Sequence, residues 1–210
     1  MKKILMTLVA AFVSVSMSAQ YYVGGGVGFR TGTTTNEVTT AGIKTSTDLK
    51  NNGFSIVPEI GMKLDDKMAI GVALGYANSK SESNPTITST TTYKINEFEI
   101  APYFRYTLAT WGNLSLFTDA QFRVLTGKET IETTGAADVE TKVNEWGLFI
   151  IPGISYQLND KFNFVAKLGS GLGYANTKRE NESTNVVRKT SDLGLSANSL
   201  GLTFGMYYNF

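Results

Sequence analysis

The sequence predicts an all-β fold: an eight-stranded antiparallel up-and-down transmembrane β-barrel, with short turns at one end and long loops at the other. Three observations support this prediction. Apolar residues recur at every second position through eight segments, which is the period of a strand and not of a helix. The alternate positions of these segments are rich in glycine and in charged residues. Short and long polar connections alternate between the segments.

The N-terminal residues 1–19 are typical of a secretory signal peptide, which leaves residues 20–210 as one barrel domain. Lys2 and Lys3 precede an apolar run, and small residues follow it, as in segments that are removed on export. We expect cleavage after Ala19 or one residue earlier. The alternative, a helical anchor that is retained, is less favoured because the apolar run is short for a membrane span.

The eight strands are predicted from the residues on their apolar faces. In the first segment the apolar residues have odd numbers, and in the other seven they have even numbers. The expected strands are residues 21–29, 54–64, 68–76, 98–108, 114–124, 146–158, 162–174 and 202–210. Thirteen glycines lie on the opposite face of these segments, against Gly25 alone on the apolar face. Because glycine in strands marks close approach, we expect the glycine face to enclose a narrow lumen and the apolar face to contact lipid.

Three connections are short and lie near residues 65–66, 109–113 and 159–160. Since even-numbered residues face outward on both sides of a turn, the turn should hold an odd number of residues, such as Asp65 to Lys67 and Asn159 to Lys161. The long connections are rich in threonine and continue to alternate. We therefore expect strands that extend beyond the membrane as a polar sheet, with disordered loops as the alternative.

Pro58, Pro102 and Pro152 each lie six residues before a leucine that ends a predicted strand. Proline lacks the N–H group that a sheet needs, and an unpaired carbonyl is costly in hydrocarbon. We therefore predict that each proline faces lipid at a bulge or at a gap in the hydrogen-bonded ladder.

The inward face of the predicted barrel carries charges of both signs, and enclosed charges must be paired to be tolerated. The predicted lumen ion pairs involve Glu59, Glu97, Glu99, Asp119, Lys63, Arg105, Arg123 and Lys167. A turn at residues 109–113 implies that Glu99 faces Arg123 and that Tyr103 faces Asp119. Large inward residues in the middle strands and small ones elsewhere predict a plugged lumen. A metal or proton site among the acidic residues is a less favoured alternative.

Aromatic residues on the apolar face predict where the membrane surfaces lie. Trp146 and Tyr156 are ten residues apart, and Phe164 and Tyr174 repeat this spacing. Ten residues of a tilted strand climb about 25 Å, which is the height of the apolar band of a membrane barrel. These four residues are therefore predicted to form aromatic girdles.

Composition excludes several classes of function. Removal of the two lysines of residues 1–19 leaves 17 basic and 18 acidic residues, a net charge of −1, so nothing indicates a nucleic acid partner. The chain has no cysteine and no histidine, which excludes disulfides and all catalytic arrangements that need these side chains. Glu97 and Glu99 are close in sequence, but neighbouring basic residues favour ion pairs. We therefore expect neither an enzyme nor a cofactor.

Three hairpins share one pattern, which appears as "VPEIGMKLDDKMAIGVALGYANSK", "APYFRYTLATWGNLSLFTDAQFRVLTG" and "IPGISYQLNDKFNFVAKLGSGLGYANTK". With the signal peptide and the terminal "LTFGMYYNF", they make the mature chain resemble the small outer-membrane β-barrel domain family of the OmpA/OmpX type. The resemblance implies a location in the cell outer membrane. It also implies that Phe204, Tyr208 and Phe210 form the signal that the barrel assembly machinery recognises.

The sequence thus predicts a non-enzymatic outer-membrane protein with a structural or surface-interaction (adhesion-type) role. Its expected partners are outer-membrane lipid, the assembly machinery and an extracellular partner that binds the loops. The alternative is a narrow porin-like channel for small solutes or ions.

Overall fold

The computed structural model describes residues 20–210, except 41–42, 87–88, 169–170 and 196–201. The predicted signal peptide, residues 1–19, lies outside the described residues. The strands are β1 (Tyr21–Thr40), β2 (Ile43–Lys63), β3 (Met68–Thr86), β4 (Ser89–Trp111), β5 (Leu114–Thr133), β6 (Val139–Gln157), β7 (Phe162–Leu168), β8 (Leu172–Asn181), β9 (Val187–Leu195) and β10 (Leu202–Asn209). Within the described part of the chain, no helix has the length and apolar character that a membrane span requires.

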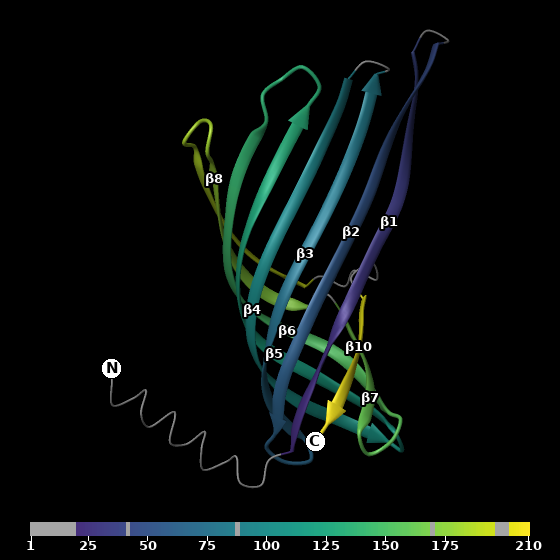
Figure 1. Cartoon of the computed structure of the whole chain (residues 1–210), viewed down its shortest axis with the longest axis vertical. Coiled ribbons are helices and arrows are strands. Elements are labelled where there is room, and N and C mark those ends of the chain that lie inside the picture. The colour runs from purple at the N-terminus through teal and green to yellow at the C-terminus, as the bar shows by residue number, and fades with distance from the viewer. Residues whose placement is uncertain (1–19, 41–42, 87–88, 169–170, 196–201) are drawn as a thin grey trace.

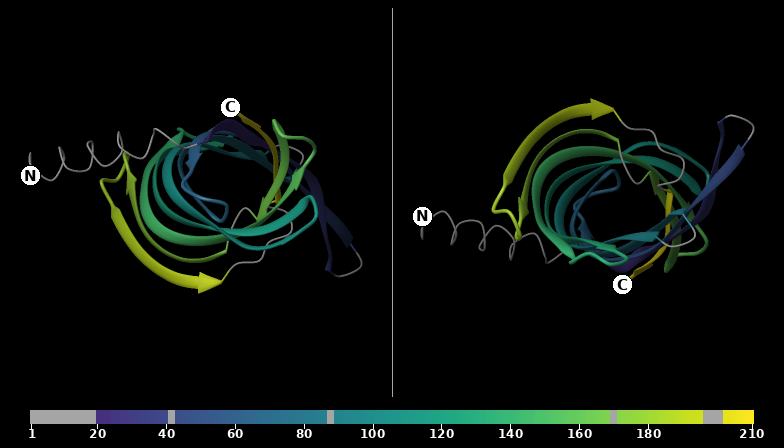
Figure 2. Two further views of the ribbon diagram at one scale, coloured as in Figure 1. Left: turned by 90° about the horizontal axis from the view of Figure 1, so that it is seen from below. Right: turned by 90° about the horizontal axis from the view of Figure 1, so that it is seen from above.

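Eight of these strands close into a ring of antiparallel pairs, as Figures 1 and 2 show. β1 to β7 follow one another around the ring, and β10 pairs with both β7 and β1 to complete it. Where the ring is complete, no strand edge is left unpaired. A sheet in hydrocarbon needs such closure because lipid offers no hydrogen-bonding partner to the backbone groups of a free edge. The predicted fold class, an eight-stranded up-and-down barrel, is confirmed.

The predicted strand of residues 162–174 is instead divided into β7 and β8. Gly153 of β6 pairs with Lys167 of β7, whereas Ile150 pairs with Leu172 of β8, so the register changes by two residues between them. β8 then pairs with β9, a strand that was not predicted. Figure 2 shows that β9 lies outside the ring. Among the described residues, β9 pairs with β8 alone.

Apolar side chains lie on the outside of the barrel and charged side chains on the inside, as the alternating pattern predicts. Ile60, Leu148 and Phe204 on the outer face are 56–61 % exposed, whereas the inward Asp119 is completely buried. In a soluble sheet the apolar side chains would instead form the buried core. The outer surface is therefore suited to contact with acyl chains.

In two of the short turns a leucine amide bonds to the first residue of the next strand and encloses the predicted three residues, and both turns share one hydrogen-bonding pattern. The Leu64 amide donates to the carbonyl of Met68, and the Asp65 carboxylate accepts from the amides of Lys67 and Met68. The turn at Asn159 repeats these contacts with the amides of Lys161 and Phe162. Asp and Asn favour such turns because their side chains bond to backbone two or three residues ahead.

The third short turn differs from the prediction. β4 continues to Trp111, and Gly112 and Asn113 alone connect it to β5. A bulge at Leu108 restores the alternation of faces, because one extra residue compensates for the even number of residues in the turn. Gly112 has a φ of +57°, which suits glycine in a two-residue hairpin turn.

The three prolines lie at interruptions of the ladder, as predicted. One side of each is regularly paired, in the pairs Pro58 with Gly25, Pro102 with Val72, and Pro152 with Thr118. On the other side the β2–β3 ladder skips Val57 and Pro58, and the β4–β5 ladder skips Ala101 and Pro102. At Pro152 the register changes between β7 and β8. Each interruption therefore falls where proline has no N–H to donate.

The long connections are largely strand, which confirms the expected polar extension. β1 to β6 have 19 to 23 residues, although a tilted strand needs only about 9–11 to cross a membrane. Ion pairs link neighbouring strands of this extension, for example Lys128 with Glu140 at 2.6 Å. An exposed hydrogen bond between Lys142 and Glu182 raises the pKa of Lys142 and lowers the pKa of Glu182.

Glycine on the inward face provides room for aromatic rings from neighbouring strands. A Cβ atom at Gly71 would lie 2.5 Å from the Tyr103 hydroxyl and 2.7 Å from the Ile60 carbonyl oxygen. Gly61 has the same relation to the ring of Tyr22, with a closest approach of 2.4 Å. These glycines are therefore a steric requirement of the filled lumen.

We expect Gly71→Ala to destabilise the barrel, because its methyl group overlaps the fixed Ile60 carbonyl. The measurement is the temperature at which the folded form disappears in a heat-modifiability gel. Gly32→Ala is the matched control, since nothing lies within 4 Å of a Cβ atom built there. Equal melting of the two variants would contradict the steric explanation.

Candidate functional site: the filled lumen and its cavities

The centre of the lumen contains two acidic and two basic side chains from four strands. Glu59 lies on β2, Arg105 on β4, Asp119 on β5 and Lys167 on β7. Glu59 is 3 %, Asp119 0 % and Arg105 8 % exposed. The formal charges of the four groups balance, which burial requires because an unpaired charge is poorly tolerated away from water.

Arg105 and Asp119 form a bidentate ion pair. The guanidinium Nε donates to Asp119 Oδ1 at 2.7 Å, and Nη2 donates to Oδ2 at 2.8 Å. Lys167 forms an ion pair with Glu59 and lies 3.5 Å from Asp119 Oδ2. Paired, charge-assisted bonds of this geometry are among the strongest in proteins. The four strands are thereby connected across the barrel.

Aromatic side chains complete this central layer. The hydroxyl of Tyr207 on β10 donates to Glu59 Oε2 at 2.7 Å and accepts from Arg105 Nη2 at 3.2 Å. The Arg105 guanidinium carbon lies 4.1 Å from the ring centre of Phe117, a favourable cation–π position. The hydroxyls of Tyr22 and Tyr103 are 2.8 Å apart. Charges and rings together fill the lumen at this level.

A second, less buried charged cluster lies nearer the long hairpins. Arg123 Nη2 donates to Glu145 Oε1 at 3.0 Å, and Arg123 Nη1 lies 3.9 Å from Glu99 Oε2. Thr177 donates to the other Glu145 oxygen at 2.9 Å. The guanidinium carbon lies 4.0 Å from the ring centre of Phe149.

The structure therefore brings together six of the eight predicted lumen residues and leaves two apart. Glu59, Arg105, Asp119 and Lys167 form the central layer, and Glu99 and Arg123 belong to the second cluster. No ion pair joins Glu97 or Lys63 to another side chain in the described ranges.

The predicted β4–β5 register is wrong by two residues. Arg105 faces Asp119, Glu99 faces Leu125, and Tyr103 faces Gln121. The error arose from the turn, because a five-residue connection was assumed where the structure has two residues and a bulge. Glu99 reaches Arg123 diagonally instead, which explains the longer distance of 3.9 Å.

Three important inward residues were missed from the sequence. Tyr22 and Tyr207 occupy inward positions of strands that were expected to supply small residues, and Glu145 was not among the predicted charges. Tyr22 and Tyr207 have the inward parity of their strands, so the period of two could have identified them. Glu145 lies just before the predicted strand of residues 146–158, and a strand start at Val139 would have included it.

Three cavities follow one another along the lumen. The outer one has a volume of about 310 Å³, the middle one about 70 Å³ and the inner one about 270 Å³. The outer and middle cavities share Glu99 and Arg123 in their linings. The inner cavity is lined by Tyr22, Arg105 and Phe117, and its lining shares no residue with that of the middle one. The central layer therefore lies between the inner cavity and the other two.

The predicted girdle residues lie on the outer face at two levels. Tyr156 and Phe164 are paired across β6 and β7, and the rings of Trp146 and Tyr174 are 5.7 Å apart near the long-hairpin end. At the C-terminus, Phe204 and Phe210 are 60 % and 74 % exposed, and the rings of Tyr208 and Phe210 are 5.0 Å apart. Contact with the assembly machinery stays a prediction.

The comparison with protein families agrees with this architecture. Residues 18–175 match the model of the family described as "outer membrane protein beta-barrel domain". The chain belongs to this family. It is therefore an outer-membrane β-barrel protein, and its short turns and long hairpins correspond to the periplasmic and extracellular ends of such barrels. No protein with a curated description matches the chain.

Solved structures with a TM-score of 0.50 or more show the same fold in proteins of distant sequence. A major outer membrane protein from Thermus thermophilus is 13 % identical with a TM-score of 0.53, over 92 % of this chain and 100 % of that one. The outer membrane protease OmpT from Escherichia coli is 15 % identical with a TM-score of 0.50, over 91 % and 97 %. Neisserial surface protein A is 14 % identical with a TM-score of 0.44, over 92 % and 99 %.

We expect Arg105→Met to destabilise the outer-membrane barrel by about 3–5 kcal/mol, because it leaves buried carboxylates without their main partner. Denaturant unfolding of the refolded barrel in micelles, followed by tryptophan fluorescence, measures the change. Lys80→Met is the control, because the pair of Lys80 with Glu82 is exposed and such pairs contribute less than about 1 kcal/mol. Equal stability of the two variants would show that the central layer does not hold the strands together.

Proposed function

We propose that this outer-membrane barrel is non-enzymatic and has a structural or surface-interaction role, carried by its extracellular hairpins. The central layer of paired charges and rings carries the proposal, because it occupies the position through which a channel would pass. An eight-stranded barrel is only just wide enough for its own side chains. The proposal includes export by a cleaved signal peptide and insertion by the assembly machinery.

The extracellular hairpins are well suited to contact other surfaces. They are polar strands rather than irregular loops, and cross-strand ion pairs stabilise them, such as Arg179 with Glu129 at 2.8 Å. A pre-organised surface loses less conformational entropy on binding than a flexible loop does. This supports an adhesion-type role over a purely structural one.

A catalytic role has little support in the chemistry of the lumen. The chain has no histidine and no cysteine, and the buried carboxylates of Glu59 and Asp119 are held by Arg105 and Lys167. The likeness to a protease at 15 % identity concerns the fold alone.

A narrow channel is the second candidate, and the cavities favour it. The outer cavity of about 310 Å³ and the inner cavity of about 270 Å³ approach the central layer from both ends. A rearrangement of Arg105 or Lys167 would be needed to connect them.

We expect the purified protein to give no stepwise conductance in planar lipid bilayers, because the central layer closes the lumen. The insertion of folded barrels is verified separately by protease protection of the reconstituted protein. Reproducible single-channel steps would favour the channel instead, and a change in their size in an Arg105→Lys variant would locate the conducting path at this layer.

A barrel with shortened hairpins tests the surface role. Residues 35–48, 81–93, 129–141 and 179–188 are each replaced by Asn-Gly, which joins residues that are paired across each hairpin. We expect this variant to fold and to be heat-modifiable but to lose the attachment to surfaces that cells expressing the full chain show. Unchanged attachment would contradict the adhesion-type role. Restoration of outer-membrane integrity by the shortened barrel in a deletion strain would instead indicate a structural role.

A further inference from the structure

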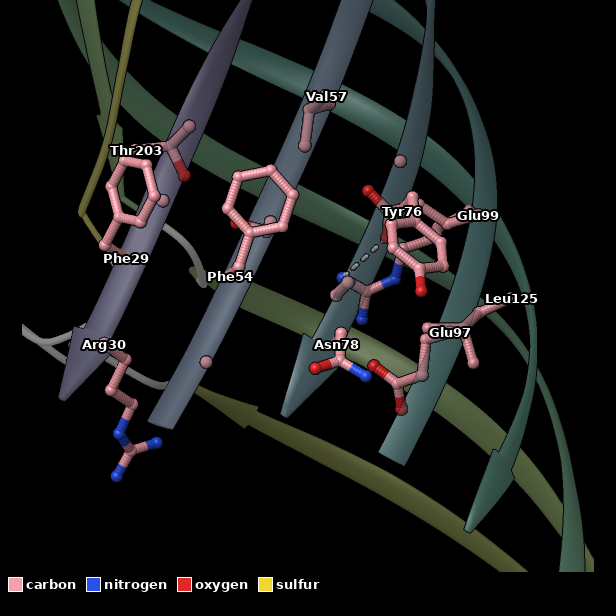
Figure 3. Close-up of a pocket in the computed structure, with 16 residues that line it drawn as sticks. Phe29, Arg30, Phe54, Val57, Tyr76, Asn78, Glu97, Glu99, Leu125 and Thr203 are labelled. Carbon is pink, nitrogen blue, oxygen red and sulfur yellow. Dashed lines mark ion pairs between the residues drawn. The ribbon is translucent and has the colours of Figure 1, made fainter. Parts of the chain in front are cut away.

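The outer cavity has features of a binding site that the closed-barrel role does not require. It lies in the extracellular half of the lumen and has a volume of about 310 Å³, which is at the lower end of the range for small-molecule sites. Figure 3 shows its lining side chains, which come from β1 to β5 and from β10. The inner cavity has a similar volume of about 270 Å³, so it is the charged lining of the outer cavity, and not its size, that points to a ligand.

The space is open because the residues between its two charged walls are small. Arg30 on β1 is paired with Gly53 of β2, which is paired with Ser79 of β3. One inward step deeper, the row from β2 to β4 runs through Ser55 and Ala77 to Glu97. Glycine, serine and alanine cannot reach across the lumen, so Arg30 and Glu97 face a common space.

Two charged side chains that line this cavity, Arg30 and Glu97, take part in none of the ion pairs among the described residues. Glu99 and Arg123 also line it, but they form an ion pair with each other at 3.9 Å. Neither Arg30 nor Glu97 has a side-chain hydrogen bond or ion pair with another residue of the described ranges. Figure 3 shows the two groups on opposite sides, Arg30 on β1 and Glu97 on β4.

The charge distribution selects the class of ligand. A simple cation bound at Glu97 would also lie near the positive charges of Arg30 and Arg123. A simple anion bound at Arg30 would lie near the negative charges of Glu97 and Glu99. A molecule with an ammonium group and an acidic group is attracted at both ends, and like-charge contact is costly for the alternatives. Val57 and Leu125 add apolar wall, which suits a small apolar substituent.

The geometry points to a binding site for a small zwitterion, with its ammonium at Glu97 and its acidic group at Arg30. Free amino acids and the phosphoethanolamine headgroup of lipids share this chemistry. The site goes beyond the proposed surface role and does not depend on it, because the ligand stays on the outer side of the central layer and needs no passage.

Calorimetry on the folded full-length mature protein in micelles tests this site with matched probes. L-Valine carries both charges, isobutylamine lacks its carboxylate, and isovalerate lacks its ammonium. We expect L-valine to bind with a Kd of about 1 mM or tighter and the two singly charged probes to bind at least tenfold more weakly. Phosphoethanolamine is titrated in parallel, and the tighter of the two zwitterions identifies the source.

Variants assign the two ends of the ligand. Glu97→Gln should weaken the binding of L-valine at least tenfold without weakening the binding of isovalerate. Arg30→Gln should weaken the binding of L-valine without weakening the binding of isobutylamine. Lys80→Gln is the control, since its exposed ion pair with Glu82 lies outside the cavity lining. Equal affinity for the three matched probes would overturn the proposal. So would the absence of a heat of binding at 10 mM zwitterion, about ten times the expected Kd. Both outcomes are measured on the unmodified protein, so they hold even if a variant fails to fold. Neither outcome affects the conductance or attachment experiments.

Discussion

The structure depends on the closure of one sheet in a solvent that cannot hydrogen-bond to it. Lipid offers no partner for backbone N–H and C=O groups, so β10 must pair with both β7 and β1 to complete the ring. Closure fixes a small radius, and the radius then determines what the lumen can hold. The glycines beside Tyr22 and Tyr103 and the placement of the three prolines both follow from this constraint.

Closure also explains the chemistry of the lumen. Side chains that would be solvated on an open sheet are enclosed here, so Asp119 and Glu59 are neutralised by Arg105 and Lys167. Tyr207 links the two ion pairs through its hydroxyl group. The outer half of the lumen is different, because small residues there leave Arg30 and Glu97 apart. The same barrel thus has a filled centre and an open outer cavity.

The sequence was sufficient for features that depend on neighbours in the chain. The period of two identified the face of each strand, and Asp65 and Asn159 marked two turns whose hydrogen bonds are local. Proline positions were predictable because the missing N–H is a property of the residue itself. The register of β4 on β5 was not predictable. The bulge at Leu108 shifts all pairs beyond it, and little in the sequence indicates a bulge there.

The sequence by itself therefore determined which residues face lipid, which face the lumen, and that the enclosed charges need partners. Only the tertiary structure decided which charged residues pair: Arg105 with Asp119, which faces it on the next strand, and Lys167 with Glu59, on strands far apart in the chain. It also decided that Tyr22 and Tyr207 belong to the central layer and that strand 162–174 divides in two. The physical reason is that alternation is set by the local backbone, whereas pairing across a lumen depends on the register and closure of all eight strands together.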